Sequence, residues 1–195
     1  MTTNPCATRP LVCTIGHSNR PIGVFIDLLK ENQVERVIDI RTVPRSRHNP
    51  QFAQEALACS LHEAGIAYSY LKSLGCLRKT RPESPNTGWR NLSFRGYADH
   101  MRSAEFGEGV EAVLRLASQA RCALMCAEAV PWRCHRSLVG DALLVRGAQV
   151  EDIIGTGVRR PHKLTPFARV DGLEIVYPPA AADANGQLAL PGLTQ

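Results

Sequence analysis

The chain has 195 residues, a length typical of one domain, and a hydrophobic fraction of 44%, which is ample for a packed core. No apolar stretch approaches the length of a membrane-spanning helix, and the residues up to Arg9 lack the apolar core of a signal peptide. The seven cysteines are odd in number and scattered, unlike the disulfide framework of a secreted protein. We therefore expect a cytoplasmic protein with reduced thiols and no membrane association.

The net charge of +5 is unevenly distributed. The segment from Arg41 to Arg102 holds ten Lys and Arg residues against four Asp and Glu residues, a net charge of +6. Many of these basic residues fall in or beside expected loops, a pattern that favours an anionic partner such as a phosphate group or a nucleic acid. The alternative interpretation of this positive charge is a basic face that is exposed to solvent and binds no partner.

Apolar periodicity predicts strands and helices that alternate along the chain. A first helix begins near Pro21, with Ser18 or Asn19 as its cap. Further helices are expected at 53–64, 93–102, 105–119 and 135–146, and strands at 11–15, 34–40, 66–71, 122–126 and 149–154. The long loop 72–92 is typical of a functional or mobile segment, and residues 170–173 have the pattern of a small hairpin.

Alternating strands and helices predict a parallel sheet with right-handed crossovers. The expected fold is therefore a single Rossmann-like α/β domain, with a mostly parallel sheet of about five strands flanked by helices. We assign this domain to residues 11–177, with an N-terminal tail at 1–10 and a disordered tail at 178–195.

Polar residues follow four of the expected strands. Because the carboxyl ends of parallel strands lie at one edge of a sheet, and ligands bind at that edge, these residues are expected to share one pocket. Glu128 is the candidate general acid or base, assisted by Asp39 or His17, and an ion pair that supports the arginine loops is its alternative role. The candidate substrate-binding residues are Ser18, Arg41, Arg45, Arg47, Arg78, Tyr97, Cys134, His135 and Arg136. The alternative role of the three arginines Arg41, Arg45 and Arg47 is structural: they would form a static network of ion pairs with Asp39 and Glu128.

The thiols near the fourth strand allow several interpretations. A zinc site of Cys126, Cys134 and His135 is disfavoured, because structural zinc sites space their cysteines by two to four residues and the gap here is seven. Cys126 as the nucleophile of a phosphatase-like or rhodanese-like loop is disfavoured too, since Arg133 lies one residue too far along the chain. A third interpretation is that Cys134 is a reactive thiol, because it stands at an expected helix N-terminus and that position lowers the pKa of a thiol. The alternative for both Cys126 and Cys134 is a packing role without reactivity. We expect no metal and no cofactor; neither a dinucleotide fingerprint nor a phosphate-binding Walker loop is present.

The chain contains the motifs Thr14-Ile15-Gly16-His17-Ser18, Asp39-Ile40-Arg41 with Pro44 and Ser46-Arg47, Pro50-Gln51-Phe52, Leu74-Gly75, Gly96-Tyr97, Met125-Cys126-Ala127-Glu128 and Cys134-His135-Arg136. Together these motifs resemble a bacterial family known as domain of unknown function 488. The resemblance runs from about Leu11 to Ile154, with Cys76 where the family usually has a second glycine. It implies an α/β domain and the same cluster of polar positions, and it implies no agreed substrate.

Three functional hypotheses follow. The first is an enzyme that acts on a phosphate-bearing substrate, a nucleotide or a nucleic acid component, by acid–base chemistry in an Arg-rich pocket. The second is a non-catalytic nucleic-acid-binding or regulatory module. The third is a sensor that depends on a thiol or a metal.

Overall fold

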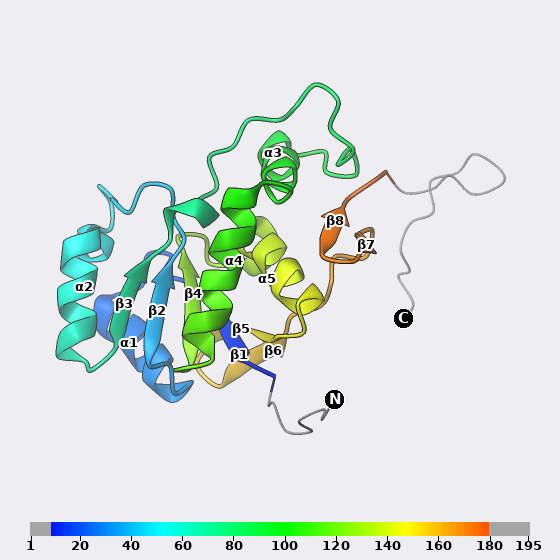
Figure 1. Cartoon of the computed structure of the whole chain (residues 1–195). Coiled ribbons are helices and arrows are strands. Elements are labelled where there is room, and N and C mark those ends of the chain that lie inside the picture. The colour runs from blue at the N-terminus through cyan, green and yellow to red at the C-terminus, as the bar shows by residue number, and fades with distance from the viewer. Residues whose placement is uncertain (1–8, 180–195) are drawn as a thin grey trace, which may run out of the picture.

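The computed structural model describes residues 9–179, so the predicted tails lie almost wholly outside the described residues. The strands and α-helices follow one another along the chain (Figure 1). The strands are β1 (Leu11–Gly16), β2 (Arg36–Asp39), β3 (Ala67–Tyr70), β4 (Cys122–Cys126), β5 (Gln149–Gly155), β6 (Val158–Pro161), β7 (Arg169–Asp171) and β8 (Glu174–Val176). The α-helices are α1 (Ile22–Glu31), α2 (Gln54–Glu63), α3 (Leu92–His100), α4 (Ala104–Ala117) and α5 (Arg136–Val145). Three short 3₁₀ turns, η1 (Pro50–Phe52), η2 (Lys72–Leu74) and η3 (Pro131–Arg133), lie in the loops.

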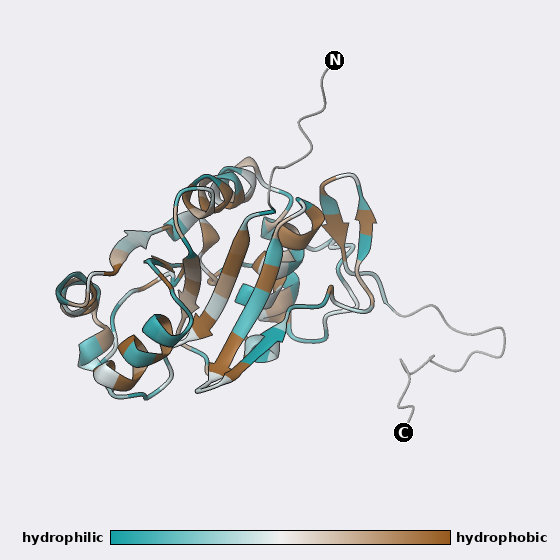
Figure 2. Ribbon diagram, turned by 90° about the horizontal axis from the view of Figure 1, so that it is seen from below, coloured by the Kyte–Doolittle hydropathy of each residue, from teal (hydrophilic) through white to brown (hydrophobic). Residues whose placement is uncertain are grey.

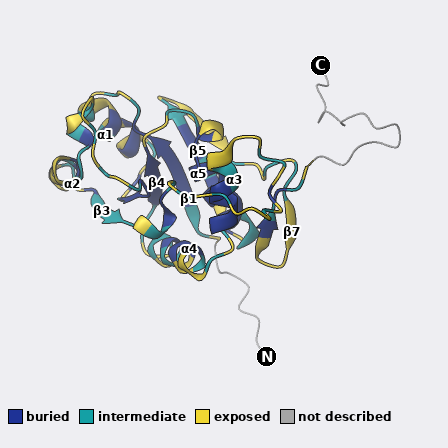
Figure 3. Cartoon of the chain, turned by 90° about the horizontal axis from the view of Figure 1, so that it is seen from above, coloured by how far each residue is buried: buried dark blue, intermediate teal, exposed yellow. Residues whose placement is uncertain are grey.

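The described residues form one six-stranded sheet in the order β3-β2-β4-β1-β5-β6 and a separate β7-β8 hairpin. The first five strands are parallel, and β4 pairs with β1 from Cys122–Val12 to Cys126–Gly16. Every residue of β4 is buried, as expected for a strand covered on both faces, and Figure 3 shows β1 and β4 buried at the centre of the sheet. The predicted mixed α/β fold with a mostly parallel sheet is confirmed, as is the small hairpin.

Helices cover both faces of the sheet. One core cluster joins α1 and α2 to strand residues such as Ile15 and Met125, and the other joins α3, α4 and α5 to residues such as Val12 and Leu124. The apolar strands are visible between these layers in Figure 2. β1 and β4 are neighbours, yet the helix after β1 lies on one face and the helix after β4 on the other. This divergence opens a crevice at the carboxyl ends of the two strands, where doubly wound folds bind ligands.

Two local features differ from the sequence-based expectation. β6, an exposed antiparallel edge strand, was not predicted, since its four residues show no apolar alternation and end at Pro161. Neither Ser18 nor Asn19 caps α1; Pro21 is the N-cap residue and makes no side-chain hydrogen bond. Ser18 instead has a φ of 51°, in the left-handed region.

A buried polar network joins α5 to β5. The imidazole of His162 lies 3.1 Å from the carboxylate of Asp141 and 3.3 Å from that of Asp152. Burial alone lowers the pKa of a histidine, but hydrogen bonds and the charges of these two carboxylates outweigh it and raise the pKa of His162 to about 9. Tyr177 donates to Asp141 at 2.9 Å, which connects the end of β8 to α5. This network contributes to the fold and lies away from the crevice between β1 and β4.

No helix in residues 9–179 combines the length and the apolar character that a membrane crossing requires.

Candidate functional site

A cavity of about 610 Å³ opens at the carboxyl edge of the sheet. The loops after β1, β2, β3 and β4 contribute to it, together with the first residues of α3. Of the candidate residues, it brings together His17, Ser18, Arg41, Arg45, Glu128, Cys134 and His135. The other lining residues are Thr42, Val43, Ser46, Asn49, Cys76, Leu77, Asn91, Ser93, Phe94, Cys126, Ala127 and Arg133.

The loops after β1 and β4 are joined closely at the cavity. The backbone N–H of His17 donates to the carbonyl of Cys126 at 2.9 Å, and that of Ser18 donates to Ala127 at 2.8 Å. A Cβ atom at Gly16 would lie 1.7 Å from the carbonyl oxygen of Glu128, so only glycine permits this approach. Glycine at the end of β1 therefore sets the position of the loop that carries Glu128.

Asp39 and Arg41 form a buried ion pair below the cavity. The guanidinium Nε of Arg41 lies 2.9 and 3.1 Å from the two carboxylate oxygens of Asp39, and Nη2 lies 2.5 Å from one of them. The backbone N–H of Arg41 and the hydroxyl of Tyr68 donate to the same carboxylate. Asp39 is fully buried and does not line the cavity, so its carboxylate serves here to hold Arg41.

His17 is held in a neutral state beside this pair. Its Nδ1 lies 2.7 Å from the carbonyl of Ser18, so Nδ1 carries the proton and Nε2 accepts from Nη1 of Arg41 at 3.4 Å. The ring stacks on Phe52 with centroids 4.2 Å apart. Burial, followed by the positive charge of Arg41, lowers the pKa of His17 to about 4. Both ring nitrogens have partners, so the geometry favours a positioning role for His17.

Three charged side chains remain available in the cavity. Arg45, Glu128 and Arg133 are exposed, and their side chains make no hydrogen bond or ion pair with any residue that the structure describes. Because the charge of Arg41 is offset by Asp39, the two free guanidiniums outnumber the single carboxylate. The cavity therefore carries a net positive charge at its open side.

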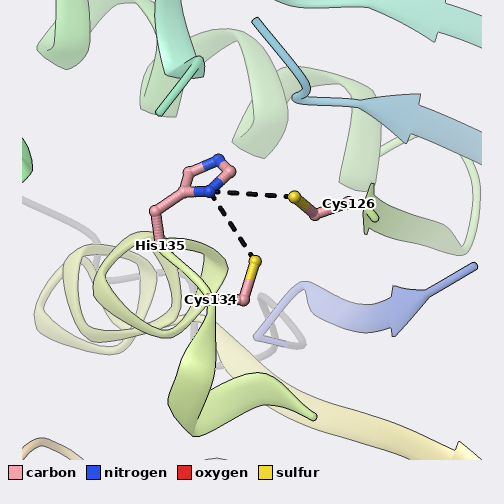
Figure 4. A group of neighbouring side chains, drawn as sticks. All are labelled: Cys126, Cys134 and His135. Carbon is pink, nitrogen blue, oxygen red and sulfur yellow. Dashed lines mark hydrogen bonds between the residues drawn. The ribbon is translucent and has the colours of Figure 1, made fainter. Parts of the chain in front are cut away.

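Two thiols and an imidazole converge on the inner wall of the cavity (Figure 4). Nδ1 of His135 lies 3.8 Å from Sγ of Cys126 and 3.6 Å from Sγ of Cys134. The other ring nitrogen, Nε2, lies 3.2 Å from the backbone carbonyl of Ile40. All three residues are buried, and the two sulfur atoms and Nδ1 lie within 4.8 Å of one another. We call Cys126, Cys134 and His135 the thiol–imidazole cluster.

The two thiols and the imidazole of this cluster shift one another's pKa values. A hydrogen bond with Cys126 lowers the pKa of the Cys134 thiol, and His135 reinforces that effect against the opposing effect of burial. The same hydrogen bond, together with burial, raises the pKa of Cys126. Burial disfavours the imidazolium form of His135, but hydrogen bonds to Cys134 and Cys76 outweigh it and raise its pKa to about 9. These pKa shifts favour the thiolate form of Cys134 and the imidazolium form of His135.

The remaining candidate residues lie outside the cavity lining. Arg47 is exposed beyond it, and Arg78 forms an ion pair with Glu105 at 3.2 Å. Tyr97 is fully buried and donates to the carbonyl of Leu74 at 2.8 Å. Arg136 is also buried, and its guanidinium donates to the carbonyls of Glu128 and Ala129 at 2.6 and 2.9 Å. Arg78, Tyr97 and Arg136 thus make contacts that support the surroundings of the cavity, whereas the side chain of Arg47 makes no hydrogen bond with any described residue.

Sequence reasoning left several lining residues out of the candidate site. Arg133 was considered only as the arginine of a phosphatase-like loop, where its spacing did not fit. Asn91 and Ser93 were not considered, although Asn91 is the residue whose side chain caps α3 by accepting from Ser93 N–H at 2.8 Å. An N-cap pattern directly after the long loop was the available indication that a helix N-terminus faces the site.

The fold and the cavity define a doubly wound α/β protein with a pocket at the carboxyl edge of its sheet. A family model described as "Domain of unknown function DUF488" matches residues 21–143, and the chain belongs to that family. This confirms the resemblance that the sequence motifs indicated. No curated protein and no solved structure matches the chain.

Proposed function

We propose that this protein is an enzyme that binds a phosphate-bearing substrate in the cavity and uses Glu128 for acid–base chemistry. The observation that carries the proposal is the pair of free guanidiniums, Arg45 and Arg133, facing one pocket with one free carboxylate. Guanidinium groups bind phosphate oxygens through strong, bidentate, charge-assisted hydrogen bonds.

The size and dipoles of the cavity support the same substrate class. Its volume of about 610 Å³ suits a nucleotide-sized molecule, since small-molecule sites range from about 300 to 1,000 Å³. Asn91 and Ser93 at the N-terminus of α3 line it, as do Cys134 and His135 at the N-terminus of α5. Helix N-termini favour bound anions. Phe94 adds an aromatic side chain against which a base can stack.

Glu128 suits the acid–base role because its carboxylate is free. It lies on the loop directly after β4, and its backbone carbonyl is fixed by Arg136 at 2.6 Å. Because the backbone at Glu128 is already held in place, its free carboxylate can reach a substrate group without a large loss of conformational entropy in the loop. A cytoplasmic location suits the protein, since the thiols beside Glu128 stay reduced there.

The binding part is tested by titrating the protein with inorganic phosphate and with a nucleoside monophosphate by calorimetry. We expect Arg45→Met and Arg133→Met each to weaken binding by about 10- to 100-fold, the value of one charge-assisted contact. Arg47→Met is the matched control, because Arg47 is an exposed arginine of the same loop outside the cavity. Equal affinities for all four proteins, or binding to none of them, would overturn the proposal.

The catalytic part is tested by screening phosphate esters for turnover with the wild type and Glu128→Gln. We expect the variant to bind the substrate with similar affinity and to lose about 10²- to 10⁴-fold in kcat, the usual contribution of a general acid or base. A Glu128→Gln variant with full activity would exclude this carboxylate as the acid or base.

A nucleic-acid-binding module is the second candidate, and exposed basic residues outside the cavity favour it. Arg47, Lys79 and Arg90 are exposed and their side chains make no hydrogen bond with described residues. A protein that tracks a phosphate backbone binds longer oligonucleotides more tightly and weakens steeply with salt. If affinity for single-stranded DNA or RNA rises with length and falls steeply with salt, the module replaces the enzyme as the better assignment.

A further inference from the structure

The thiol–imidazole cluster has the shape of a zinc site. In a tetrahedral site with Zn–S distances of about 2.3 Å and a Zn–N distance of about 2.0–2.1 Å, a sulfur and a nitrogen ligand lie about 3.5–3.6 Å apart. The two sulfur-to-Nδ1 distances here are 3.8 and 3.6 Å. The two sulfur-to-nitrogen separations therefore already match those of a tetrahedral zinc site, and the two sulfurs lie within 4.8 Å of each other, which the seven-residue gap in the sequence did not indicate.

The orientation of His135 favours a metal ion further. Its Nε2 lies 3.2 Å from the carbonyl of Ile40, an acceptor, so Nε2 carries a proton and Nδ1 is the nitrogen that can bind a metal. In metal sites the non-ligating ring nitrogen of a histidine usually donates to a carbonyl or carboxylate in this way. Nδ1 is also the atom that faces both sulfurs in Figure 4.

Rigid elements hold the three ligands in place. Cys126 ends β4, whose neighbours β1 and β2 pair with it on both sides. Cys134 and His135 stand at the start of α5, where the hydroxyl of Ser137 donates to the carbonyl of Cys134 at 2.9 Å. Arg136 ties the connecting loop to the helix through the carbonyls of Glu128 and Ala129. Ligands that are positioned before binding lose little freedom when a metal arrives.

We propose that Cys126, Cys134 and His135 bind one Zn²⁺ ion, with the fourth coordination position open toward the cavity. Two thiolates and an imidazole are soft and borderline ligands, which select zinc over magnesium or calcium. Two thiolates also offset the charge of the ion at this buried position. All three residues line the cavity, so the ion has an entry path and its free position faces the space assigned to the substrate.

Cys76 does not take the fourth position in this arrangement. It lines the same cavity, interacts with His135 and lies 3.7 Å from the hydroxyl of Thr42, but it is not one of the three residues whose ligand atoms all lie within 4.8 Å of one another. Zinc sites with three protein ligands and one exchangeable position are characteristic of catalytic metal centres. The metal proposal does not depend on the substrate, and a zinc ion here would lie in the same cavity as Glu128.

The experiment is metal analysis of the full chain purified under reducing conditions without chelator. We expect one Zn²⁺ per chain in the wild type and in Cys59→Ser, a control in which an exposed thiol on α2 is removed. Cys126→Ser, Cys134→Ser and His135→Gln are expected to lose the ion. A wild type that cannot be loaded, or a Cys126→Ser/Cys134→Ser double variant that keeps one Zn²⁺, overturns the proposal.

Cobalt substitution tests the same metal site in the wild-type chain, so its result does not depend on whether the variants fold. The metal-free protein is titrated with Co²⁺ under nitrogen. We expect tetrahedral d–d bands in the visible range and thiolate-to-cobalt charge-transfer bands in the near ultraviolet, both saturating at one equivalent. Weak octahedral bands without charge transfer would show that the sulfurs do not bind, and the proposal would fail whatever the phosphate titrations give.

The open coordination position has its own test. Cys76→Ser is expected to keep one Zn²⁺ and an unchanged cobalt spectrum, and added azide is expected to shift the d–d bands of the cobalt form. Loss of the metal in Cys76→Ser together with no response to azide would show a closed site with four protein ligands. That result would overturn the open position.

Discussion

Removing the charge of Asp39 tests whether this carboxylate is structural. In Asp39→Asn the side chain keeps its shape, but the guanidinium of Arg41 stays buried without its counter-charge. Breaking a buried ion pair from one side costs about 3–5 kcal/mol, because the remaining charge is uncompensated. The geometry supports the upper part of that range, since Asp39 is fully buried and accepts from Arg41 at 2.5, 2.9 and 3.1 Å.

Urea denaturation followed by circular dichroism measures this loss, with thermal unfolding as a second readout. At this chain length a change of 1 kcal/mol moves the melting temperature by about 2–4 °C, so we expect a decrease of about 6–20 °C. Tyr68→Phe is the matched control, because it removes one hydrogen bond to the same carboxylate but leaves the ion pair intact, and it should cost about 1.5–3 kcal/mol.

A double-mutant cycle then separates the pair from its surroundings. Arg41→Met leaves the Asp39 carboxylate with the Tyr68 hydroxyl and one backbone N–H, so it is also expected to destabilise the fold. In the double variant Asp39→Asn/Arg41→Met both charges are absent, and we expect it to be more stable than the sum of the single losses predicts, by about 1–3 kcal/mol. Additive losses, or an Asp39→Asn variant within about 0.5 kcal/mol of the wild type, would refute the structural role and reopen a catalytic one.

Two further predictions concern stability. The raised pKa of His162, about 9 against 6.5 in the unfolded chain, gives stability that is fully present below pH 6.5 and is lost as the pH rises through 9. His162→Gln should therefore remove about 2–3 kcal/mol at pH 6 and much less at pH 9.5, as urea denaturation at both pH values will show; a pH-independent loss contradicts the linkage. Gly16→Ala places a Cβ 1.7 Å from a backbone carbonyl and should cost at least about 2–3 kcal/mol, whereas Gly23→Ala, with nothing within 4 Å, should be neutral or stabilising. Equal melting temperatures for the two alanine variants would contradict the close approach of the β1 and β4 loops.

The fold was predictable because its information is local. Each of the five parallel strands is a short run that is separated from the next by at least one helix, and β1, β2 and β4 are largely buried, so periodicity and length were enough to indicate the class. β6 was missed for the opposite reason. Val158–Pro161 has two arginines and a proline, and only its pairing with β5 makes it a strand.

The sequence predicted the location of the candidate site but not the contacts that its side chains make. The rule that parallel strands end at one edge indicated that the residues after β1, β2 and β4 share a cavity. Which arginines face it depends on partners that are distant in the sequence or on loop geometry. Arg78 pairs with Glu105, 27 positions away, whereas Arg45 and Arg47 differ only in the direction that their loop gives them. Charge counting treats these three residues as equivalent, and the structure does not.

Cys126 and Cys134 show why the usual spacing of cysteine ligands in zinc sites does not apply to this cluster. The rule of two to four residues between cysteine ligands describes ligands on one tight turn. Here Cys126 ends β4 and Cys134 lies directly before the N-cap residue of α5, and the seven residues between them form a loop whose last part is η3, Pro131–Arg133. The buried guanidinium of Arg136 binds two carbonyls of that loop and so brings its ends together. The contacts of Arg136 thus bring the two cysteines together without a short spacing in the sequence. The sheet and the helix, rather than the local sequence, set the geometry of the ligands.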